Sequence, residues 1–492
     1  MGHVHAIVLV TYLLLLLVVG AWKARSVRTQ ADFSLAGRGL GTTVLAGTLL
    51  ATWIGTGSVF GNAQKGYTDG LAALVLPLSS AVGIAVLFLL AARIRRMEHF
   101  TIQDILEERF GVGARLLGTL ALLGGYVIIV SYQYRAGSAV LEYLWPQIRE
   151  APDALTGEIA PSTVGVCAVA AFVILYTALA GMISVAYTDV ANGVLMTLGL
   201  ALALGIVVSR AGGGAELLAA LPADARDVGA YPVSRVVSYL LPAFLLILGD
   251  ANMYQRFFSA RDERTARRSA VGMFAGVLLL DWMIIALAVG CAALVAQGAV
   301  AAPSNPAHAI VHVAFEVLPA GLGALLCATV VAVVVSTADS YLLAPATSLV
   351  RDVYQRFLRP AASEAEIVAA ARVAVVGLGL LALFLAFQAT SFFEVALFAY
   401  TLYGAAITPP LLAAFFWKGA TPAGALASMV TGLVVAVWWE VSLGAELLAR
   451  APEGALAEGL AHLDAALPAV CVSVAALVAV SLFTRPRAAA GP

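Results

Sequence analysis

The sequence predicts an all-α integral membrane protein with about thirteen transmembrane helices. Apolar residues make up 62% of the 492 residues and charged residues only 12%, whereas soluble domains are about half apolar and a quarter charged. The mean hydropathy is +0.95, as expected for a chain that lies mostly in lipid. The 28 Lys and Arg residues balance the 29 Asp and Glu residues, so the basic surface that nucleic acids require is missing. We expect contact with the lipid bilayer and no nucleic-acid partner.

The apolar stretches have the length of membrane-spanning helices, which need about 20 residues. Their predicted limits are 4–22, 41–63, 70–92, 116–143, 161–181, 187–209, 233–255, 269–297, 319–348, 366–388, 392–416, 421–443 and 467–484. In the first stretch the positive charges Lys23, Arg25 and Arg28 follow the apolar run, whereas in a signal peptide they precede it. We therefore predict a retained first helix and a single transmembrane domain over 1–492.

The positive charges alternate between the two sides of the predicted spans. With the N-terminus outside, twenty-one Lys and Arg residues fall on the internal side and six on the external side, and Arg135 alone falls within a span. Positive charges collect on the cytoplasmic side of membrane proteins. This distribution predicts a multi-pass protein of the cell (inner) membrane with its C-terminus in the cytoplasm. On the internal side, Thr101 and Asp104 have the spacing of a capping box and predict a short helix.

Two spans depart from plain Leu, Val and Ala helices. One reads "LLATWIGTGSVFGNAQKGYTDG" and the other "LLPAFLLILGDANMYQRFF", with Asp250 and Asn252 in the middle. Non-helical backbone in a bilayer is tolerated only where it lines a cavity or lies inside protein. Interruptions at matching places in two halves indicate a transporter binding site. The alternative is that the glycines simply allow close helix packing.

The two interrupted spans each open a block of five spans, 41–209 and 233–416. Because five is odd, the second block is predicted to be inverted relative to the first. This arrangement is a five-plus-five inverted repeat, with 4–22 as an extra N-terminal helix and 421–484 as two C-terminal helices.

Hydroxyl side chains lie together in "VVVSTADSYLLAPATS", where Val333, Ser336 and Thr337 share one helix face. Their two hydroxyls and a backbone carbonyl form part of an oxygen shell for a small cation. Carbonyls of the interrupted span near Ala51 and Ile54 can supply the remaining oxygens. The alternative is that both hydroxyls bond back to carbonyls of their own helix. On a regular helix Asp339 points away from this face, so we expect it to brace neighbouring helices or the exit path.

Six motifs in this order resemble the sodium:solute symporter family and extend over roughly 32–428. They are "DFSLAGRGLGTTV", "ATWIGTGSVFG", "GMISVAYTDV", "MYQRFFSA", "VVSTADSYLLA" and "FFWKGATPAGALAS". The resemblance implies a fold of the leucine-transporter type and Na⁺-driven uptake by alternating access. It also implies Na⁺ ligands, which are the carbonyls of Ala51, Ile54 and Val333 and the hydroxyls of Ser336 and Thr337.

Asp189 matches a family carboxylate near the inward Na⁺ path, with a structural partnership to an internal arginine as the alternative. The solute is expected between spans 41–63, 116–143, 233–255 and 392–416. The candidate residues are Trp53, Thr56, Tyr132, Gln133, Arg135, Asp250, Asn252, Tyr254, Tyr400 and Tyr403. An intramembrane charge needs a partner, and Asp250 is the candidate for Arg135. The sequence assigns no role to Asp281 or Glu394.

The expected cargo is a small polar organic solute, transported together with Na⁺. The motifs "ATWIGTGSVFG" and "SVAYTDV" are similar to the choline-transporting branch, where aromatic faces hold a quaternary ammonium. Choline-type uptake and proton coupling through Asp189 or Asp250 are alternatives, and a solute sensor with the transporter fold is a further one. No nucleophile and base arrangement is evident in the spans, so we do not expect an enzyme.

Overall fold

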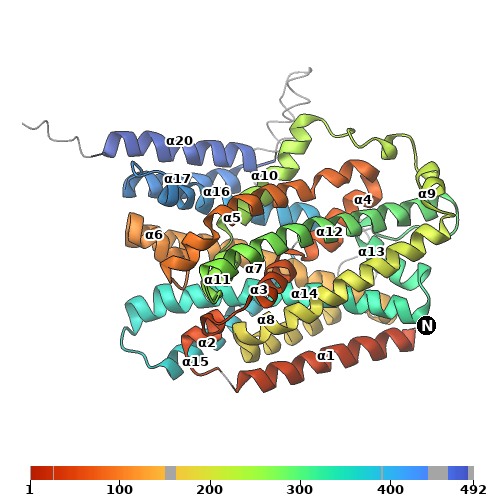
Figure 1. Cartoon of the computed structure of the whole chain (residues 1–492), viewed down its shortest axis with the longest axis horizontal. Coiled ribbons are helices and arrows are strands. Elements are labelled where there is room, and N and C mark those ends of the chain that lie inside the picture. Colours follow the sequence, from red (N-terminus) through yellow and green to blue (C-terminus); the bar gives the residue numbers. More distant parts are fainter. Residues whose placement is uncertain (1, 26, 150–161, 389–391, 441–463, 486–492) are drawn as a thin grey trace, which may run out of the picture.

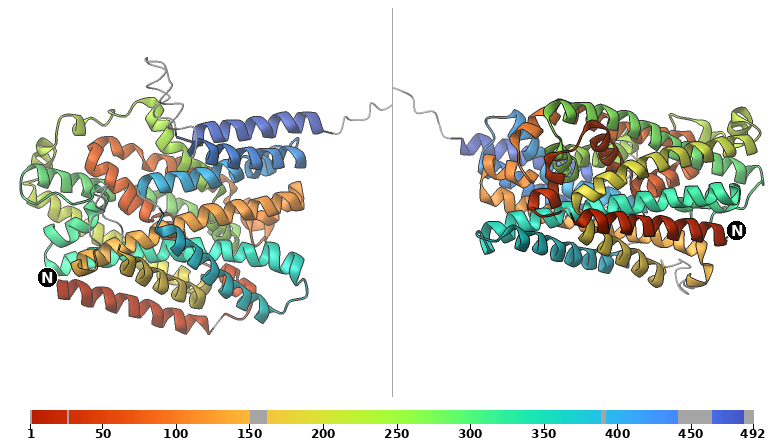
Figure 2. Two further views of the ribbon diagram at one scale, coloured as in Figure 1. Left: turned by 180° about the vertical axis from the view of Figure 1, so that it is seen from behind. Right: turned by 60° about the horizontal axis from the view of Figure 1, so that its bottom comes forward.

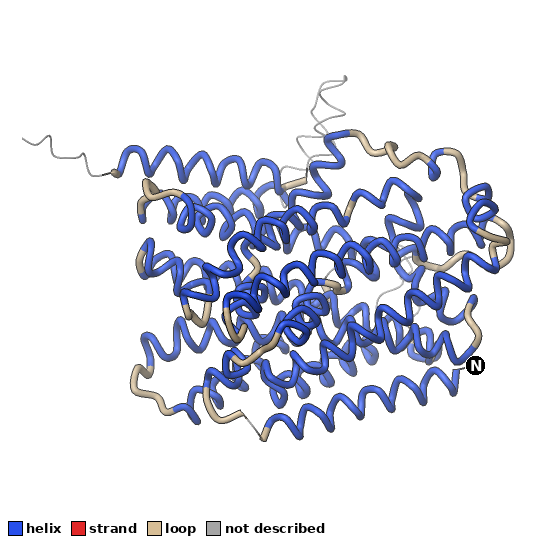
Figure 3. The backbone as a smooth tube through the Cα atoms, viewed as in Figure 1, coloured by secondary structure: helices blue, strands red, loops and turns tan. Residues whose placement is uncertain are grey.

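The structure is a computed structural model that describes residues 2–25, 27–149, 162–388, 392–440 and 464–485. Long helices run side by side in one bundle (Figure 1), and short loops join them (Figure 3). The helices of the first half are α1 (Gly2–Ala24), α2 (Gln30–Leu35), η1 (Ala36–Arg38), α3 (Thr42–Trp53), η2 (Gly57–Asn62), α4 (Ala63–Asp69), η3 (Gly70–Val75), α5 (Pro77–Met97), α6 (Ile102–Phe110), α7 (Val112–Leu144), η4 (Pro146–Ile148), α8 (Thr163–Arg210), α9 (Gly214–Ala220) and η5 (Asp224–Arg226).

The second half continues this all-helical pattern. Its helices are α10 (Val233–Gly249), α11 (Ala251–Ser259), α12 (Glu263–Ala296), η6 (Pro306–His308), α13 (Ala309–His312), η7 (Val313–Val317), α14 (Ala320–Ser348), η8 (Leu349–Leu358), α15 (Glu364–Ala386), α16 (Phe392–Phe416), α17 (Pro422–Trp438) and α20 (Ala466–Thr484). The end of the predicted span 421–443 and most of the predicted loop 444–466 lie outside the described residues.

Among the described residues, ten helices are long and apolar enough to cross a membrane, or eleven if the bent pair Thr42–Trp53 and Gly57–Val75 is one span. The all-helical membrane fold is thus confirmed. Fewer spans result than the thirteen predicted segments for two reasons. Helix α17 has 17 residues and counts as a shorter apolar helix, and α8 contains both 161–181 and 187–209.

Helix α8 reverses direction at Gly181, whose φ of +61° suits glycine. The hydroxyls of Tyr176 and Thr188 lie 3.0 Å apart, although twelve residues of straight helix would separate their backbones by about 18 Å. A side chain at Gly181 would also meet Phe33 of α2 at 3.0 Å. The two predicted segments are therefore two arms of a helical hairpin.

Helix α14 lies at the centre of the bundle, and its residues from Gly323 to Ser348 are almost all buried. It packs against α7, both arms of α8, α3 and α1. Helices α1 and α20 lie at opposite edges of the bundle in Figure 1 and in the left view of Figure 2. The hydroxyl-bearing segment that the sequence singles out is thus in the most enclosed part of the fold.

Both predicted interruptions are confirmed. Helix α3 ends at Trp53, because Ile54 adopts extended angles (φ −71°, ψ 97°), and the chain bends by 53° before it continues as η2. Helix α10 ends at Gly249, and Asp250 adopts similar angles (φ −63°, ψ 113°) before α11 begins. Each break leaves carbonyl groups without a partner in their own helix, so they need partners elsewhere.

The predicted capping box at the start of α6 is also confirmed. The Thr101 hydroxyl accepts a hydrogen bond from the Asp104 N–H (3.3 Å), and the Asp104 carboxylate accepts one from the Thr101 N–H (3.2 Å). These two bonds satisfy amide groups that the first helical turn cannot satisfy itself.

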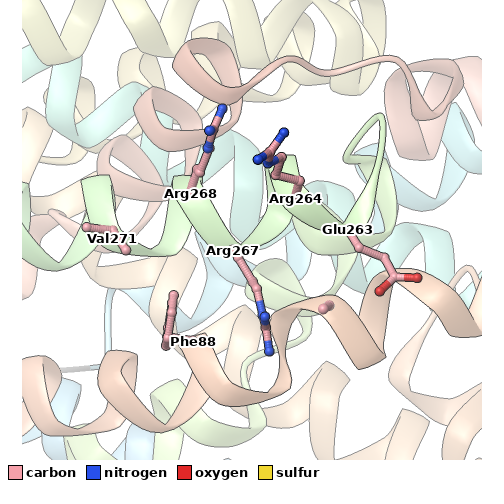
Figure 4. Close-up of a pocket in the computed structure, with 7 residues that line it drawn as sticks. Phe88, Glu263, Arg264, Arg267, Arg268 and Val271 are labelled. Atoms are coloured by element: carbon pink, nitrogen blue, oxygen red, sulfur yellow. The ribbon is translucent and has the colours of Figure 1, made fainter.

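Basic side chains gather where α12 begins. Arg264, Arg267 and Arg268 line a cavity with Phe88 of α5, as Figure 4 shows. Glu263 at the same end pairs with Arg96 through two hydrogen bonds of 3.0 and 2.7 Å. Within the part of the chain that the structure describes, the three arginines form no ion pair with a carboxylate, so this end of the bundle is strongly positive.

Candidate functional site

The predicted cation ligands of two distant segments meet at the break of α3. The Ser336 hydroxyl donates a hydrogen bond to the Ala51 carbonyl (3.2 Å), and the Thr337 hydroxyl donates one to the Ile54 carbonyl (3.3 Å). Val333 lies one turn earlier on the same face of α14 and is buried. Four of the five predicted oxygens are therefore in direct contact in pairs, and all of these residues are enclosed by protein.

The alternative role for these hydroxyls, bonding back to their own helix, occurs elsewhere on α14. The Ser340 hydroxyl donates to the Ser336 carbonyl (2.9 Å), and the Thr329 hydroxyl donates to the Leu325 carbonyl (2.9 Å). Ser336 and Thr337 instead bond across to α3. Their oxygens thus face the end of a broken helix, where carbonyl oxygens carry partial negative charge and suit a small cation.

Gly55 sets how closely the two segments approach, because a Cβ at this position would lie 2.9 Å from the Thr337 Cγ2 and 3.0 Å from its hydroxyl oxygen. We expect Gly55→Ala to lower the free energy of unfolding by about 1–3 kcal/mol. We also expect it to weaken the Na⁺ binding that the sequence predicts for these ligands at least about tenfold, or roughly 1.4 kcal/mol. Isothermal titration of the purified protein with NaCl measures the affinity. Gly377→Ala, on an exposed face where an added Cβ meets nothing, serves as the control, and equal effects of the two changes would contradict the prediction.

Asp189, on the second arm of α8, joins this cluster. Its carboxylate accepts hydrogen bonds from the Ser336 hydroxyl and from the Thr48 hydroxyl (2.6 Å). The same carboxylate lies 3.7 Å from the Arg256 guanidinium. Asp189 therefore contacts a predicted cation ligand and is also paired with an arginine.

Arg256 corrects the expectation that Arg135 is the only cation within a span. It lies within the candidate span Val233–Ser259 and is 0% exposed. Its guanidinium donates to the hydroxyls of Thr48 (3.0 Å) and Ser340 (2.6 Å). The expectation was wrong because hydropathy ended the span at 255, whereas α11 continues to Ser259 after the break. Arg256 follows Asn252 by four positions, so the two share one helix face, and this helical spacing was the available signal.

Asp250 is not paired with Arg135. Its carboxylate accepts hydrogen bonds from the N–H groups of Asn252 (2.7 Å) and Met253 (3.1 Å) and from the Tyr341 hydroxyl (2.8 Å). It thus caps α11, because the first turn of a helix leaves N–H groups unsatisfied. The pair was predicted because both residues are charged and lie within the membrane. The N–H groups that the break of α10 leaves free donate to Asp250 instead.

Arg135 is buried in α7, and its charge acts on His308 of η6. Burial, followed by the charges of Arg149 and Arg135, lowers the pKa of His308 in η6 to about 4.

Two predicted solute residues satisfy the broken backbone instead. The Tyr403 hydroxyl donates to the Gly249 carbonyl (2.8 Å), and the Tyr254 hydroxyl donates to the Leu248 carbonyl (3.1 Å). These carbonyls lost their helical partners at the end of α10. Tyr126 and Tyr341, which the sequence argument missed, pack with Tyr403 around Asp250, with ring centroids 4.6 and 5.1 Å from Tyr126. In the sequence alone, nothing distinguishes these two tyrosines from other aromatic residues of the core.

The remaining solute candidates form a second polar cluster beside the α3 break. The Thr56 hydroxyl donates to the Gln133 side-chain oxygen, the Tyr132 and Tyr400 hydroxyls lie 3.3 Å apart, and the Trp53 indole N–H donates to Ser80 (3.0 Å). These contacts join the break of α3 to α7, α16 and α5.

Two buried amides of the candidate set have unsatisfied groups. The Gln133 Nε2 atom and both polar side-chain atoms of Asn252 have no hydrogen-bond partner among the described residues. Leaving such groups unpaired costs about 1–3 kcal/mol each. They are therefore suited to a polar ligand.

Comparisons with known proteins show the family of the chain. A model of the sodium:solute symporter family matches residues 33–432. The high-affinity proline transporter PutP of Bacillus subtilis (strain 168) is 26% identical over 451 residues, which cover 86% of this chain and 89% of that protein. The high-affinity choline transporter 1 of Drosophila melanogaster is 28% identical over 466 residues, which cover 90% of this chain and 71% of that protein.

Solved structures share the fold. A substrate-bound, outward-open Na⁺-coupled sialic acid symporter aligns over 98% of both chains with a TM-score of 0.78 and 17% identity. MHP1, a transporter of the nucleobase-cation-symport-1 family, aligns over 94% of this chain and 96% of that chain with a TM-score of 0.56 and 13% identity.

A helical membrane bundle with two broken spans and an oxygen cluster at one break defines a secondary transporter of the leucine-transporter fold. The chain belongs to the sodium:solute symporter family. It is a multi-pass membrane protein and a Na⁺-coupled solute symporter, with Na⁺ as co-substrate, and the family consists of transporters and not enzymes. The predictions of family, fold and Na⁺-coupled symport are confirmed.

Proposed function

We propose that the protein takes up a small polar organic solute with Na⁺ held by the carbonyls of Ala51, Ile54 and Val333 and the hydroxyls of Ser336 and Thr337. The observation that carries this proposal is that both hydroxyls bond across to the carbonyls of the α3 break and not to their own helix. Unwound carbonyls with neighbouring hydroxyls suit Na⁺, because they offer oxygen atoms without a group that must lose a proton.

Na⁺ at this position would link α14 to α3 and so couple ion binding to solute binding. The same break of α3 that supplies the carbonyls also positions Trp53 and Thr56 on the solute side. By linkage, Na⁺ raises solute affinity by the same factor by which solute raises Na⁺ affinity. Alternating access then moves both sites together from the outer to the inner side.

Asp189 is proposed to line the ion path. It accepts a hydrogen bond from Ser336, so an ion leaving that hydroxyl meets a carboxylate at once. The guanidinium of Arg256, 3.7 Å from Asp189, competes for the same charge and would favour release of the ion. Asp339 accepts a hydrogen bond from Thr177 (2.5 Å) and joins α14 to the first arm of α8, as expected of a bracing residue.

The solute is proposed to contact Trp53, Thr56, Tyr132, Gln133, Asn252 and Tyr400. Free amide groups of Gln133 and Asn252 support this assignment, as do the linked hydroxyls of Tyr132 and Tyr400. For Asp250, Tyr254 and Tyr403 we propose that they shape the site by holding the α10 break. We propose that Arg135 contributes its positive charge to the part of the protein near His308 of η6.

The domain and orientation predictions also stand as proposals. We propose that 41–209 and 233–416 form inverted repeats, flanked by 4–22 and by 421–484, with the N-terminus outside and the C-terminus in the cytoplasm of a cell (inner) membrane protein. The cluster of Arg264, Arg267 and Arg268 supports this orientation, because unpaired positive charges collect on the cytoplasmic side (Figure 4).

We expect the purified protein to melt at a higher temperature in NaCl than in KCl, and Thr337→Ala to abolish this difference. Na⁺ at 100 times its dissociation constant stabilises by about 2.7 kcal/mol, and the variant lacks one of the ligands. Thr329→Ala removes a hydroxyl of the same helix that bonds to the carbonyls of Leu325 and of Leu195 in α8 and not to α3, and it is expected to keep the difference. Stabilisation that ignores the cation, or that survives in Thr337→Ala, would contradict the proposed site and favour proton coupling.

A further inference from the structure

Asp281 is a buried carboxylate to which the proposed transport mechanism assigns no role. It lies near the middle of α12 and is 2% exposed. Two neutral donors from η2 face it, the Asn62 amide at 3.5 Å and the Ser58 hydroxyl. In the described ranges of the chain it forms no ion pair with Lys, Arg or His. A charge buried in this way is costly unless a cation pairs with it.

Aromatic rings surround the cavity that Asp281 lines. Trp53 of α3, Tyr239 of α10, and Phe393 and Tyr400 of α16 form its walls, and Ser58 and Asn62 lie beside the carboxylate. The faces of aromatic rings are negative, so they attract positive charge. A carboxylate among four rings is an environment for a cation and a poor one for an anion or an uncharged polyol.

Lys65 of α4 demonstrates this attraction at the edge of the cavity. Its ammonium lies 5.1 Å from the ring centroid of Tyr239 and 5.0 Å from that of Phe393. Lys65 forms an ion pair with Asp69 at 3.9 Å, and both side chains are partly exposed. Two rings of the cavity thus already contact an ammonium group, whereas Asp281 pairs with no cation among the described residues.

We propose that Asp281 and the rings of Trp53 and Tyr400 bind a positively charged nitrogen of the transported solute. The solute class is then an amine, a quaternary ammonium compound or a zwitterion, and not a sugar or a simple carboxylate. This inference rests on the proposed function, because Trp53 and Tyr400 also belong to the proposed solute site. The hydrogen-bonding groups of Gln133 and Asn252 would receive the polar remainder of such a solute.

The test measures the melting temperature and ligand affinity of the purified full-length protein in NaCl. The probes are choline, tetramethylammonium and proline, with 3,3-dimethyl-1-butanol as the uncharged shape analogue of choline and acetate as an anion. At least one ammonium probe is expected to stabilise the protein, whereas the uncharged analogue and acetate do not. Asp281→Asn is expected to weaken that affinity at least about thirtyfold, since it removes one partner of a buried charge pair, and Asp281→Glu to restore part of it.

Glu394→Gln is the matched control, because it removes an exposed carboxylate next to Phe393 and should change the affinity less than about threefold, as expected of an exposed charge. Equal binding of choline and its uncharged analogue would overturn the inference. The same holds if no ammonium probe stabilises the protein, or if Asp281→Asn binds as tightly as the wild type.

The difference between NaCl and KCl without any probe separates the two proposals. If Na⁺ stabilises both the wild type and Asp281→Asn, the variant is folded and any failure of the ammonium probes concerns this inference alone. If Na⁺ stabilises neither protein, the proposed function fails first.

Discussion

Arg256→Met is expected to lower the free energy of unfolding by about 3–5 kcal/mol, because it leaves the Asp189 carboxylate buried without its cation. Arg256 and Asp189 are each fully buried, so water cannot replace the lost partner. The hydroxyls of Thr48 and Ser340 also lose the donor that they accept from. Thermal unfolding in detergent measures the loss, which would show as a fall in melting temperature.

The double variant Asp189→Asn with Arg256→Met separates an unpaired charge from lost packing. We expect it to recover most of the stability of the wild type, because neither charge then remains alone in the interior. If Asp189 lines the ion path, the double variant still loses much of the stabilisation by Na⁺. Arg268→Met removes an exposed arginine of α12 and should cost less than about 1 kcal/mol. A cost for Arg256→Met as small as this control would contradict the prediction.

Arg115→Met is expected to have the second large effect, again of about 3–5 kcal/mol. Arg115 is 7% exposed and forms ion pairs with Asp104 and Glu107 of α6 and with Asp352 of η8, the last at 2.7 Å. Without the guanidinium, three carboxylates face one another at the junction of α6, α7 and η8. Chemical or thermal unfolding of the purified protein measures this loss.

Asp104 makes one contribution to the pH dependence of this cluster. Burial raises the pKa of Asp104, but hydrogen bonding to the Phe100 N–H and the charge of Arg115 outweigh it and hold the pKa below its ordinary value. A lowered pKa contributes stability above the unfolded-state pKa, and this stability is lost as the pH falls through the folded-state pKa. We therefore expect the part of the difference between the wild type and Arg115→Met that Asp104 contributes to be full at neutral pH and to be lost below about pH 4.

Arg356→Met is the matched control for this cluster. Arg356 pairs with the same Glu107 at 2.8 Å, but its side chain is 53% exposed. An exposed ion pair contributes at most about 1 kcal/mol. Similar losses for Arg115→Met and Arg356→Met would show that burial does not set the energy of the cluster.

Much of the fold could be read from the sequence because a bilayer makes local composition decisive. Apolar length marks the spans, and a backbone that must satisfy its own polar groups inside lipid makes glycine and Asp250 in mid-span a sign of a break. Both breaks are present at Ile54 and Asp250. The sequence predicts two separate segments, 161–181 and 187–209. In the structure both belong to α8, and the reversal at Gly181 separates them.

The candidate ion ligands could be proposed from the sequence for a similar reason. Ser336 and Thr337 are adjacent on one face of a helix, and the interrupted span was the available source of carbonyls. Helical periodicity is local, so it determined which atoms share a face. It could not determine whether the hydroxyls bond within their own helix or across to α3, and the tertiary contact with Ala51 and Ile54 decides that.

The partners of the buried charges and tyrosines depended on the tertiary structure alone. The chain by itself determined its class, its apolar segments, its two breaks and its family. Only the packing of segments far apart in sequence decided that Asp250 caps α11 and contacts Tyr341, that Arg256 pairs with Asp189, and that Tyr403 holds the Gly249 carbonyl. The physical reason is that hydropathy and helix periodicity act along the chain, whereas a buried charge or hydroxyl bonds to whichever group the fold places within about 3 Å.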